Sequence, residues 1–447
     1  MRIAAPDTAA PGDTVLLAGS GNDPVRGALP ATSLIWSIGD SEVARGYQAL
    51  VVMPPSGSVV VTLEASDSTG SHADTSHTIT VAGRGAALWR TSLPSNVMGF
   101  LTTLTYSPDD HTLYVSGNGS VVALAREATY RWRVAPVISL NGPPAVRPGG
   151  LFYLTDVQRF NALDNTGGSQ WEDSLAFGAW GIGSDGVAIG FSRYAGNPAL
   201  VRLGPTGAIL QHADVIFGSP SQSNFFIDRS GTAWSLIPVV VVSYPSGATV
   251  GHFEFNAPCG SGAGMLPGVG GSIVLTSSSC ISANTSSGGL QWTSAPTGFT
   301  IVAPPAVGRD GTLYFGLSNG AVVAMAPGGA ERWRSSALPT GCGGAVNSVG
   351  TPAIGADGTV FYHAGGRLVA LDAGGTQLWV RPTVSDTTLN GCAQQTSVLL
   401  TSDGWLFTFT TFDGGSLVSA FAAGTVADTL APWGQYLSDE RHSRRAH

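Results

Sequence analysis

Residues 307–336 read VGRDGTLYFGLSNGAVVAMAPGGAERWRSS and contain three strand-like runs separated by glycine turns. A near copy, IGADGTVFYHAGGRLVALDAGGTQLWVRP, begins at Ile354. Runs such as TLYFG are apolar with little alternation, as expected for strands that are covered on both faces. The Asp-Gly pairs supply the positive φ that a tight hairpin turn requires. A stretch that recurs in this way indicates a structural unit, so its period decides the fold.

A tryptophan after a glycine-containing turn is the clearest mark of this unit along the chain. It occurs, with spacings of 43, 39, 121, 41 and 46 residues, at Trp89, Trp132, Trp171, Trp292, Trp333 and Trp379. The gap of 121 residues corresponds to three periods, with GAILQHADV and ATVGHFEF in the two missing positions. We expect these tryptophans to be structural and to fill the space between neighbouring units.

A turn before the second strand of each unit is the second mark. It appears as SPDDHTLYVSG, RPGGLFYLTD, GSDGVAIGF, DRSGTAWSL, PGVGGSIVLTS, GRDGTLYFG, GADGTVFYH and TSDGWLFTF. Four short strands in a period of about 40 residues are typical of a β-propeller blade. The sequence therefore predicts an all-β protein with an eight-bladed β-propeller over residues 84–437, or with seven blades if the unit near residue 270 is irregular.

Residues 1–83 precede the repeats and contain a series of short strand-like runs with one early tryptophan, Trp36. This pattern is typical of a β-sandwich. The segments LAGSGNDPVRG, LIWSIGDSE and VTLEASDSTG resemble the PKD and related immunoglobulin-like modules of bacterial surface and secreted proteins. Asp23 and Asp67 are interpreted as turn residues, and calcium binding by this segment stays open. Residues 438–447 are expected to form a flexible basic tail.

The units PAVGRDGTLYFGLSNGAVVAMAPGGAERWR and PAIGADGTVFYHAGGRLVALDAGGTQLWVR resemble the pyrroloquinoline quinone (PQQ)-type propeller repeat. The ending APWGQYLSDERHSRR resembles a segment that flanks such arrays, matched here by Trp433, Tyr436, Asp439 and Ser443. The resemblance implies an envelope scaffold or surface protein, or alternatively a quinone-dependent dehydrogenase that uses PQQ with Ca²⁺. Such dehydrogenases have an adjacent-cysteine disulfide ring, a tryptophan stacked on the quinone, a bound calcium and a catalytic aspartate. This chain has no Cys-Cys pair and no lysine.

We therefore do not favour an enzyme, and we assign no catalytic, cofactor-binding or metal-binding residue. The histidines of the repeat region fall in different units, with no spacing that suggests a common metal: His111, His212, His252 and His363. The net charge of −8 is spread along the chain without the basic stripe of a nucleic-acid binder. No run approaches the length that a membrane helix needs. We expect a monomer.

Four separated cysteines suggest two disulfides. Cys342 and Cys392 stand in the loops that enter neighbouring units, and Cys259 and Cys280 fall in one unit, so we predict the pairs 342–392 and 259–280. Disulfides imply an oxidising compartment, and we expect the protein in the periplasm, at the cell surface or secreted. No signal peptide is visible in the first residues. Four buried free thiols are the alternative.

The loops that enter the innermost strands are long and rich in Gly, Asn and Ser, and the candidate binding residues in them are Asn141, Asn224, Asn347 and Gln394. Small polar residues offer hydrogen bonds without fixed charge, which suits a peptide or a sugar better than a phosphate. We expect a non-catalytic extracytoplasmic binding or scaffolding protein that uses these loops for protein or glycan contacts. The alternatives are the quinone-dependent dehydrogenase with an atypical site and a carbohydrate-binding surface protein.

Overall fold

The structure is a computed structural model of the 447-residue chain. It describes the whole chain except residues 6, 10–13, 55–56, 68, 94–102, 118–119, 135–139, 141–142, 156–157, 176, 184, 195–196, 215–224, 229–230, 237–238, 243–248, 253–263, 296–297, 339–348, 384–393, 396, 413–414, 432–433, 436–438 and 440–447. The chain divides into two compact units. The first is Met1–Leu88 with Asp403–Leu406 and Ala420–Val426, and the second comprises the remaining residues. The predicted basic tail lies outside the described residues, apart from Asp439.

The N-terminal part of the first unit contains two main sheets, with strand orders β1-β3-β8 and β2-β10-β9-β6-β7, and a small β4-β5 pair. The pairing is antiparallel except between β10 and β2. The strands are β1 (Arg2–Ala4), β2 (Thr8–Ala9), β3 (Thr14–Ser20), β4 (Asn22–Asp23), β5 (Gly27–Ala28), β6 (Leu34–Ile38), β7 (Ser41–Arg45), β8 (Gln48–Val52), β9 (Gly57–Ser66) and β10 (His72–Val81).

Trp36 lies at the centre of the core that these two sheets share. Its side chain is fully buried with Leu17 of β3 and Leu63 of β9, and its indole N–H donates to the Gly46 carbonyl at 2.9 Å. Along β9, buried and exposed residues alternate, because successive side chains of a strand point to opposite faces. A Cβ at Gly19 would lie 2.6 Å from the Trp36 ring, so glycine lets β3 pass close to it.

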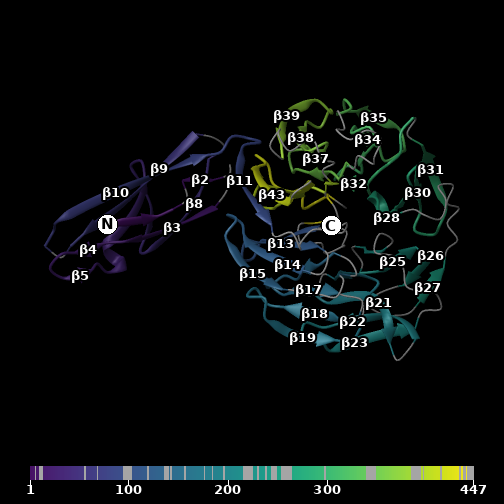
Figure 1. The fold of residues 1–447 in the computed structure, drawn as a ribbon, viewed down its shortest axis with the longest axis horizontal. Coiled ribbons are helices and arrows are strands. Elements are labelled where there is room, and N and C mark those ends of the chain that lie inside the picture. The colour runs from purple at the N-terminus through teal and green to yellow at the C-terminus, as the bar shows by residue number, and fades with distance from the viewer. Residues whose placement is uncertain are drawn as a thin grey trace. The chain divides into compact units, whose positions relative to one another are not determined.

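Most of the second unit consists of antiparallel four-stranded sheets built from consecutive strands. In Figure 1 these sheets follow one another around a common centre, with the first strand of each sheet innermost and the fourth outermost. The sheets are β12 (Thr103–Ser107) to β15 (Tyr130–Val134), with β13 (Thr112–Gly117) and β14 (Ser120–Ala125); β16 (Ala145–Val146), β17 (Phe152–Thr155), β18 (Phe160–Leu163) and β19 (Ser169–Asp173); β20 (Ala179–Ile182), β21 (Ala188–Tyr194), β22 (Asn197–Leu203) and β23 (Ile209–Asp214); β24 (Phe225–Ile227), β25 (Ala233–Leu236), β26 (Val239–Val242) and β27 (Thr249–His252); β28 (Gly264–Pro267), β29 (Ile273–Thr276), β30 (Ile281–Asn284) and β31 (Leu290–Ser294); β32 (Ala306–Val307), β33 (Leu313–Gly316), β34 (Val322–Met325) and β35 (Glu331–Arg334); and β36 (Ala353–Ile354), β37 (Val360–Ala364), β38 (Arg367–Leu371) and β39 (Gln377–Pro382).

The last sheet combines strands from both ends of the repeat region. Its order is β11 (Ala87–Leu93), β43 (Gly415–Ala422), β42 (Trp405–Phe412) and β40 (Gln394–Gln395), and β41 (Leu399–Leu400) also pairs with β42. The segment around Trp89 thus supplies the outer strand of this sheet. Further on, the buried Gln435 side chain accepts a hydrogen bond from the Leu400 N–H and donates to the Leu400 carbonyl, at 2.9 and 3.0 Å, so the chain end is tied back to β41.

Five repeat tryptophans reach from the outer strand of one sheet into the turn between the third and fourth strands of the next. The acceptors of their indole N–H groups are the carbonyl oxygens of Arg126 for Trp89 (2.7 Å), Asn165 for Trp132 (2.7 Å), Pro205 for Trp171 (2.7 Å), Pro327 for Trp292, and Ala373 for Trp333 (2.8 Å). In four of these turns the residue two positions after the acceptor is a glycine with φ between +81° and +85°, namely Gly167, Gly207, Gly329 and Gly375. A Cβ there would lie 2.6–2.8 Å from the tryptophan ring. The repeated Trp and Gly therefore form a dock between neighbouring sheets.

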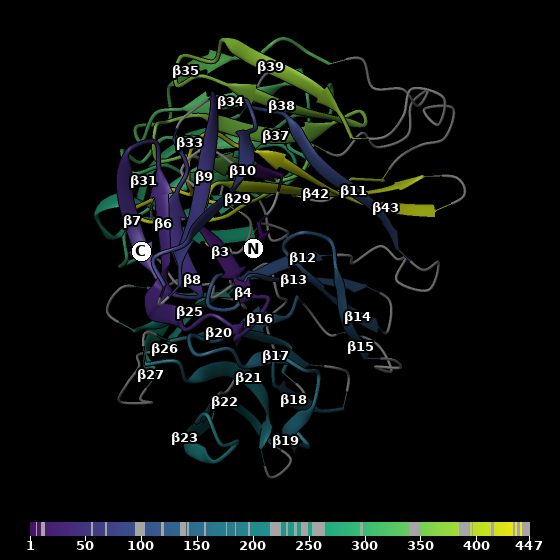
Figure 2. The ribbon, with the colours of Figure 1, turned by 90° about the vertical axis from the view of Figure 1, so that its left-hand side faces the viewer.

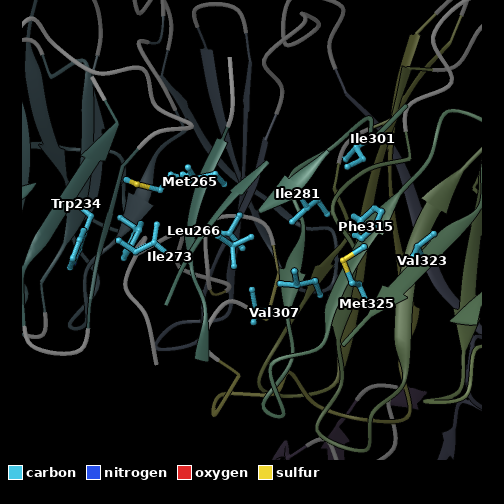
Figure 3. Packing of buried hydrophobic residues seen from close by; sticks show 14 of the residues in the cluster. Trp234, Met265, Leu266, Ile273, Ile281, Ile301, Val307, Phe315, Val323 and Met325 are labelled. Atoms are coloured by element: carbon cyan, nitrogen blue, oxygen red, sulfur yellow. The ribbon is translucent and has the colours of Figure 1, made fainter. Parts of the chain in front are cut away.

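The apolar cluster in Figure 3 shows how neighbouring sheets pack against one another. It joins Trp234 of β25, Ile281 of β30 and Phe315 of β33, so it spans three neighbouring sheets. Ile301, from the loop before β32, is 8% exposed and belongs to the same cluster. The loop that carries Ile301 is therefore anchored in the core.

Candidate functional site

Most of the predicted binding residues lie outside the part of the chain that the structure describes. Asn141, Asn224 and Asn347 belong to segments that are not described. Gln394 lies on β40, where it pairs with Thr411 of β42. Of these four residues, the structure therefore places only Gln394.

Cys280 is disulfide-bonded, and it follows β29 in the turn that leads to β30. The other three cysteines, Cys259, Cys342 and Cys392, lie outside the described residues. The pairings 259–280 and 342–392 therefore remain predictions.

Three loops at the same end of two neighbouring sheets form a surface rich in hydroxyl groups. We call residues 277–280, 298–301 and 317–320 the hydroxyl-rich surface. The first loop connects β29 to β30, the second precedes β32, and the third connects β33 to β34. Ser278, Ser279, Phe299 and Thr300 are exposed on it.

Backbone hydrogen bonds hold the three loops together. The Ile301 N–H donates to the Ser278 carbonyl at 2.8 Å, and the Ser318 N–H donates to the Thr300 carbonyl at 2.9 Å. Ile301 and Leu317 also form an isolated antiparallel bridge. Because Ile301 is buried in the cluster of Figure 3, it anchors the exposed Phe299 and Thr300 that precede it.

The chemistry of the hydroxyl-rich surface is polar and uncharged. The three loops read SSSC, GFTI and LSNG and contain no acidic or basic residue. The Ser277 hydroxyl is within 3.3 Å of the Ser279 hydroxyl and accepts a hydrogen bond from the Cys280 N–H at 3.2 Å. Phe299 is 44% exposed among these hydroxyls. A surface of this kind can hydrogen-bond a backbone or a sugar and can stack an apolar face on its aromatic ring.

Among the described residues, no group of three or more His, Cys, Asp or Glu side chains could hold a metal ion. His363 is fully buried, with its Nε2 2.9 Å from the Thr383 hydroxyl, and His111 Nδ1 is 2.8 Å from the Tyr106 hydroxyl. These imidazoles are engaged with hydroxyls rather than with one another. We derive no catalytic step from them.

Shifted side-chain pKa values in the second unit report packing and turn formation. Burial raises the pKa of three tyrosines at equivalent positions of second strands, Tyr114, Tyr153 and Tyr314, and that of Tyr362 on β37. At Asp164, hydrogen bonds from the Thr166 side chain and the Gly168 N–H lower the pKa of the carboxyl group. These shifts come from burial and from hydrogen bonds within a turn, so we do not assign an acid–base pair from them.

Comparison with known proteins places the repeats in a family. A family model of the PQQ repeat type, described as outer membrane protein assembly factor BamB, matches residues 76–194 and 238–428, which is more than half of the chain. The chain belongs to this family of β-propellers. Members of the BamB-like family share the repeat described above, so the resemblance in the sequence to the PQQ-type repeat is confirmed. No curated protein matches the chain.

Solved structures show the same fold at low sequence identity. The chain is similar to BamB from Moraxella catarrhalis, with a TM-score of 0.50 and 13% identity over 74% of this chain and 97% of that one. It is similar to the Dos1 propeller, with a TM-score of 0.57 and 9% identity over 76% and 95%. A quinonprotein alcohol dehydrogenase-like protein from Bacteroides thetaiotaomicron aligns with a TM-score of 0.42 and 12% identity over 73% and 92%. Within the described residues, no helix is long and apolar enough to cross a membrane.

The hydroxyl-rich surface was missed by sequence reasoning, which selected asparagines in other loops. The signal that could have found it is the pair of short hydroxyl-rich segments SSSC and TGFT, which stand about one strand pair apart and lack charge. Their proximity depends on the hydrogen bond from the Ile301 N–H to the Ser278 carbonyl, which a sequence pattern does not contain.

Proposed function

We propose that this protein is a non-catalytic binding or scaffolding protein, and that the hydroxyl-rich surface and the channel-facing loops contact a protein segment or a glycan. The observation that carries the proposal is the exposed Phe299 ring among uncharged hydroxyls on loops anchored through Ile301. Exposed aromatic rings with adaptable polar neighbours are typical of recognition surfaces. Membership of a family described as an assembly factor also favours binding over catalysis.

We further propose the architecture in which this surface works. Eight blades agree with the eight turn marks, with the consecutive four-stranded sheets, and with β11 as the outer strand of the last sheet. A PKD/immunoglobulin-like sandwich over residues 1–83 is supported by the two sheets that share Trp36 in their core. An extracytoplasmic location is supported by the disulfide at Cys280 and by the family description, and we propose that the protein is a monomer.

Ligand selection with a matched pair of variants tests the proposed function. The full chain is applied to a glycan array and to a random-peptide display library, and each selected ligand is titrated against F299A and L290A. Leu290 is a suitable control because it is 43% exposed, against 44% for Phe299, and lies at the start of β31 in the same region. Truncation of an aromatic contact costs roughly 1–2 kcal/mol, or about tenfold in Kd.

The proposal expects F299A to weaken the selected ligand by about that factor and L290A to leave it unchanged. Binding to a sugar and binding to a peptide are distinguished by which library yields the ligand. Equal binding by F299A and the unmodified protein would place the contact elsewhere and contradict the proposal.

A further inference from the structure

Three neighbouring sheets of the repeat region carry arginines and no acidic residue on their outer strands. The six strands are β38 (RLVAL), β39 (QLWVRP), β43 (GSLVSAFA), β11 (ALWRTSL), β14 (SVVALA) and β15 (YRWRV). We call their arginines, Arg90, Arg131, Arg133, Arg367 and Arg381, the basic rim. By contrast, β19 carries Glu172 and Asp173, and β23 carries Asp214. The outer strands are therefore polarised, with positive charge concentrated on one group of sheets.

Most other described arginines of the second unit are paired with carboxylates. Examples are Arg159 with Glu172 at 2.6 Å and Arg332 with Asp310 at 2.6 Å. Arg90 and Arg367 differ, because neither has a carboxylate partner among the residues that the structure describes. A guanidinium has five N–H donors in a planar fork, so these side chains keep most of their capacity to bind an anion.

Three arginines of the basic rim, Arg90, Arg367 and Arg381, lie around the end of β39, and β11 of the neighbouring sheet runs beside this end (Figure 2). Arg90 donates from Nη2 to the Pro382 carbonyl at 2.6 Å. Arg367 is the cross-strand partner of Pro382, and the Arg381 guanidinium lies 5.6 Å from the centre of the Trp379 ring. Because neighbouring residues of a strand point to opposite faces, Arg381 and Arg367 lie on opposite faces of this sheet.

β39 also has an indole N–H and an outer strand edge that lack hydrogen-bond partners among the described residues. Trp379 occupies the position of the docked tryptophans, but its indole N–H has no acceptor among the described residues, unlike the five that donate to a turn of the next sheet. β39 ends the strand order of its sheet, and no further strand of the described chain pairs with its outer edge. Leu378 beside it is 47% exposed.

We propose that the outer edge of β39, with Arg90, Arg367 and Arg381, binds an extended acidic segment of a partner protein. An added strand would pair its backbone with the edge and present alternate side chains to the two faces. Carboxylates on one face would meet Arg381 and Arg90, and those on the other would meet Arg367. Arginine and carboxylate form bidentate, charge-assisted hydrogen bonds, which gives the segment both register and selectivity.

Fluorescence anisotropy with labelled peptides tests this site on the full chain. The probe is a short peptide that repeats Glu-Glu-Thr-Thr, so that an added strand presents carboxylates to both faces, and its matched control repeats Gln-Gln-Thr-Thr. The variants are R90Q/R381Q at the site, R367Q as a second site variant that keeps the Arg90 and Arg381 contacts, and R159Q on another sheet as the control that removes the same single charge as R367Q. Near-ultraviolet circular dichroism confirms that each variant keeps its fold.

The proposal expects the Glu probe to bind more tightly than the Gln probe, with affinity that falls as salt is added. R90Q/R381Q should lose about tenfold or more in affinity, since hydrogen bonds to charged groups are worth about 1.5–3 kcal/mol each. R367Q should lose part of the affinity, and R159Q should bind as the unmodified chain does.

Three results would overturn the proposal. The Glu and Gln probes binding alike would remove the role of carboxylates. An equal loss in R159Q would reduce the effect to overall charge. Binding of a short polyphosphate in place of the Glu probe would make the rim a phosphate site and would reject a protein segment as its partner.

Discussion

The glycine of the Trp–Gly dock offers a quantitative test of how the sheets are held together, with Gly375→Ala as the perturbation. Gly375 has φ +84°, and a Cβ there would lie 2.6 Å from Cδ2 of Trp333, whereas ordinary contact begins at 3.4 Å. A left-handed backbone costs an alanine about 1–2 kcal/mol. Overpacking against a ring that is held by its own hydrogen bond adds about 1–3 kcal/mol. Alanine also restricts the unfolded chain more than glycine does, which offsets only about 0.4–1 kcal/mol of this loss of stability.

We therefore expect Gly375→Ala to lower the free energy of unfolding by about 2–4 kcal/mol. Gly150→Ala is the matched control, because Gly150 has φ +89° but nothing within 4 Å of its added Cβ. The control should lose only the free energy that a left-handed backbone costs an alanine, about 1 kcal/mol. Urea unfolding followed by tryptophan fluorescence measures both variants under one set of conditions. Equal losses in the two variants would show that the Trp333 ring yields freely, and the dock would then not be a structural contact.

Three further outcomes follow from the same contacts and from the cysteines. Ala128 has φ +69° two residues after the carbonyl that accepts the Trp89 indole N–H, where the other docks have glycine, so Ala128→Gly should stabilise the protein by up to about 1 kcal/mol in urea unfolding. Burial alone would raise the pKa of Asp310, but hydrogen bonds from Thr312 and Arg332 outweigh it and lower the pKa. The stability that Asp310 contributes is then present above its unfolded pKa and lost as pH falls through its folded pKa, so an Asp310→Asn variant should differ from the unmodified chain at neutral pH and converge with it in acid. Reduction should raise the intact mass by about 4 Da if both predicted disulfides form, and an unchanged mass would contradict them.

Much of the fold could be predicted from the sequence because the residues that define each repeat lie close together in the chain. Asp-Gly turns, continuous apolar strands and the tryptophan at a fixed place identify the four-stranded unit without any long-range contact. The unit near residue 270 shows the limit of this reasoning. Its turn is a 3₁₀ turn over Val269–Gly271 in place of Asp-Gly, yet β28 to β31 form an ordinary four-stranded sheet.

The candidate sites could not be predicted in the same way, because they depend on contacts between distant segments. Arg90 and Pro382 are 292 positions apart in the chain and meet only when β11 and β39 lie in neighbouring sheets. The undocked Trp379 has the same local sequence pattern as the docked tryptophans, so its different surroundings have no local signal. Asparagine-rich loops were selected for composition alone, and composition does not tell which loops lie together.

Site-specific photo-crosslinking at residue 299 tests the central claim, that the hydroxyl-rich surface is where this propeller binds. A photoreactive phenylalanine analogue replaces Phe299 in one sample and Leu290 in another, in the full chain produced in its own cells. The two positions are 44% and 43% exposed, so differences in exposure do not favour either one. We expect a discrete crosslinked adduct from position 299 and none from position 290. No adduct at 299, or the same adducts at both positions, would contradict the account.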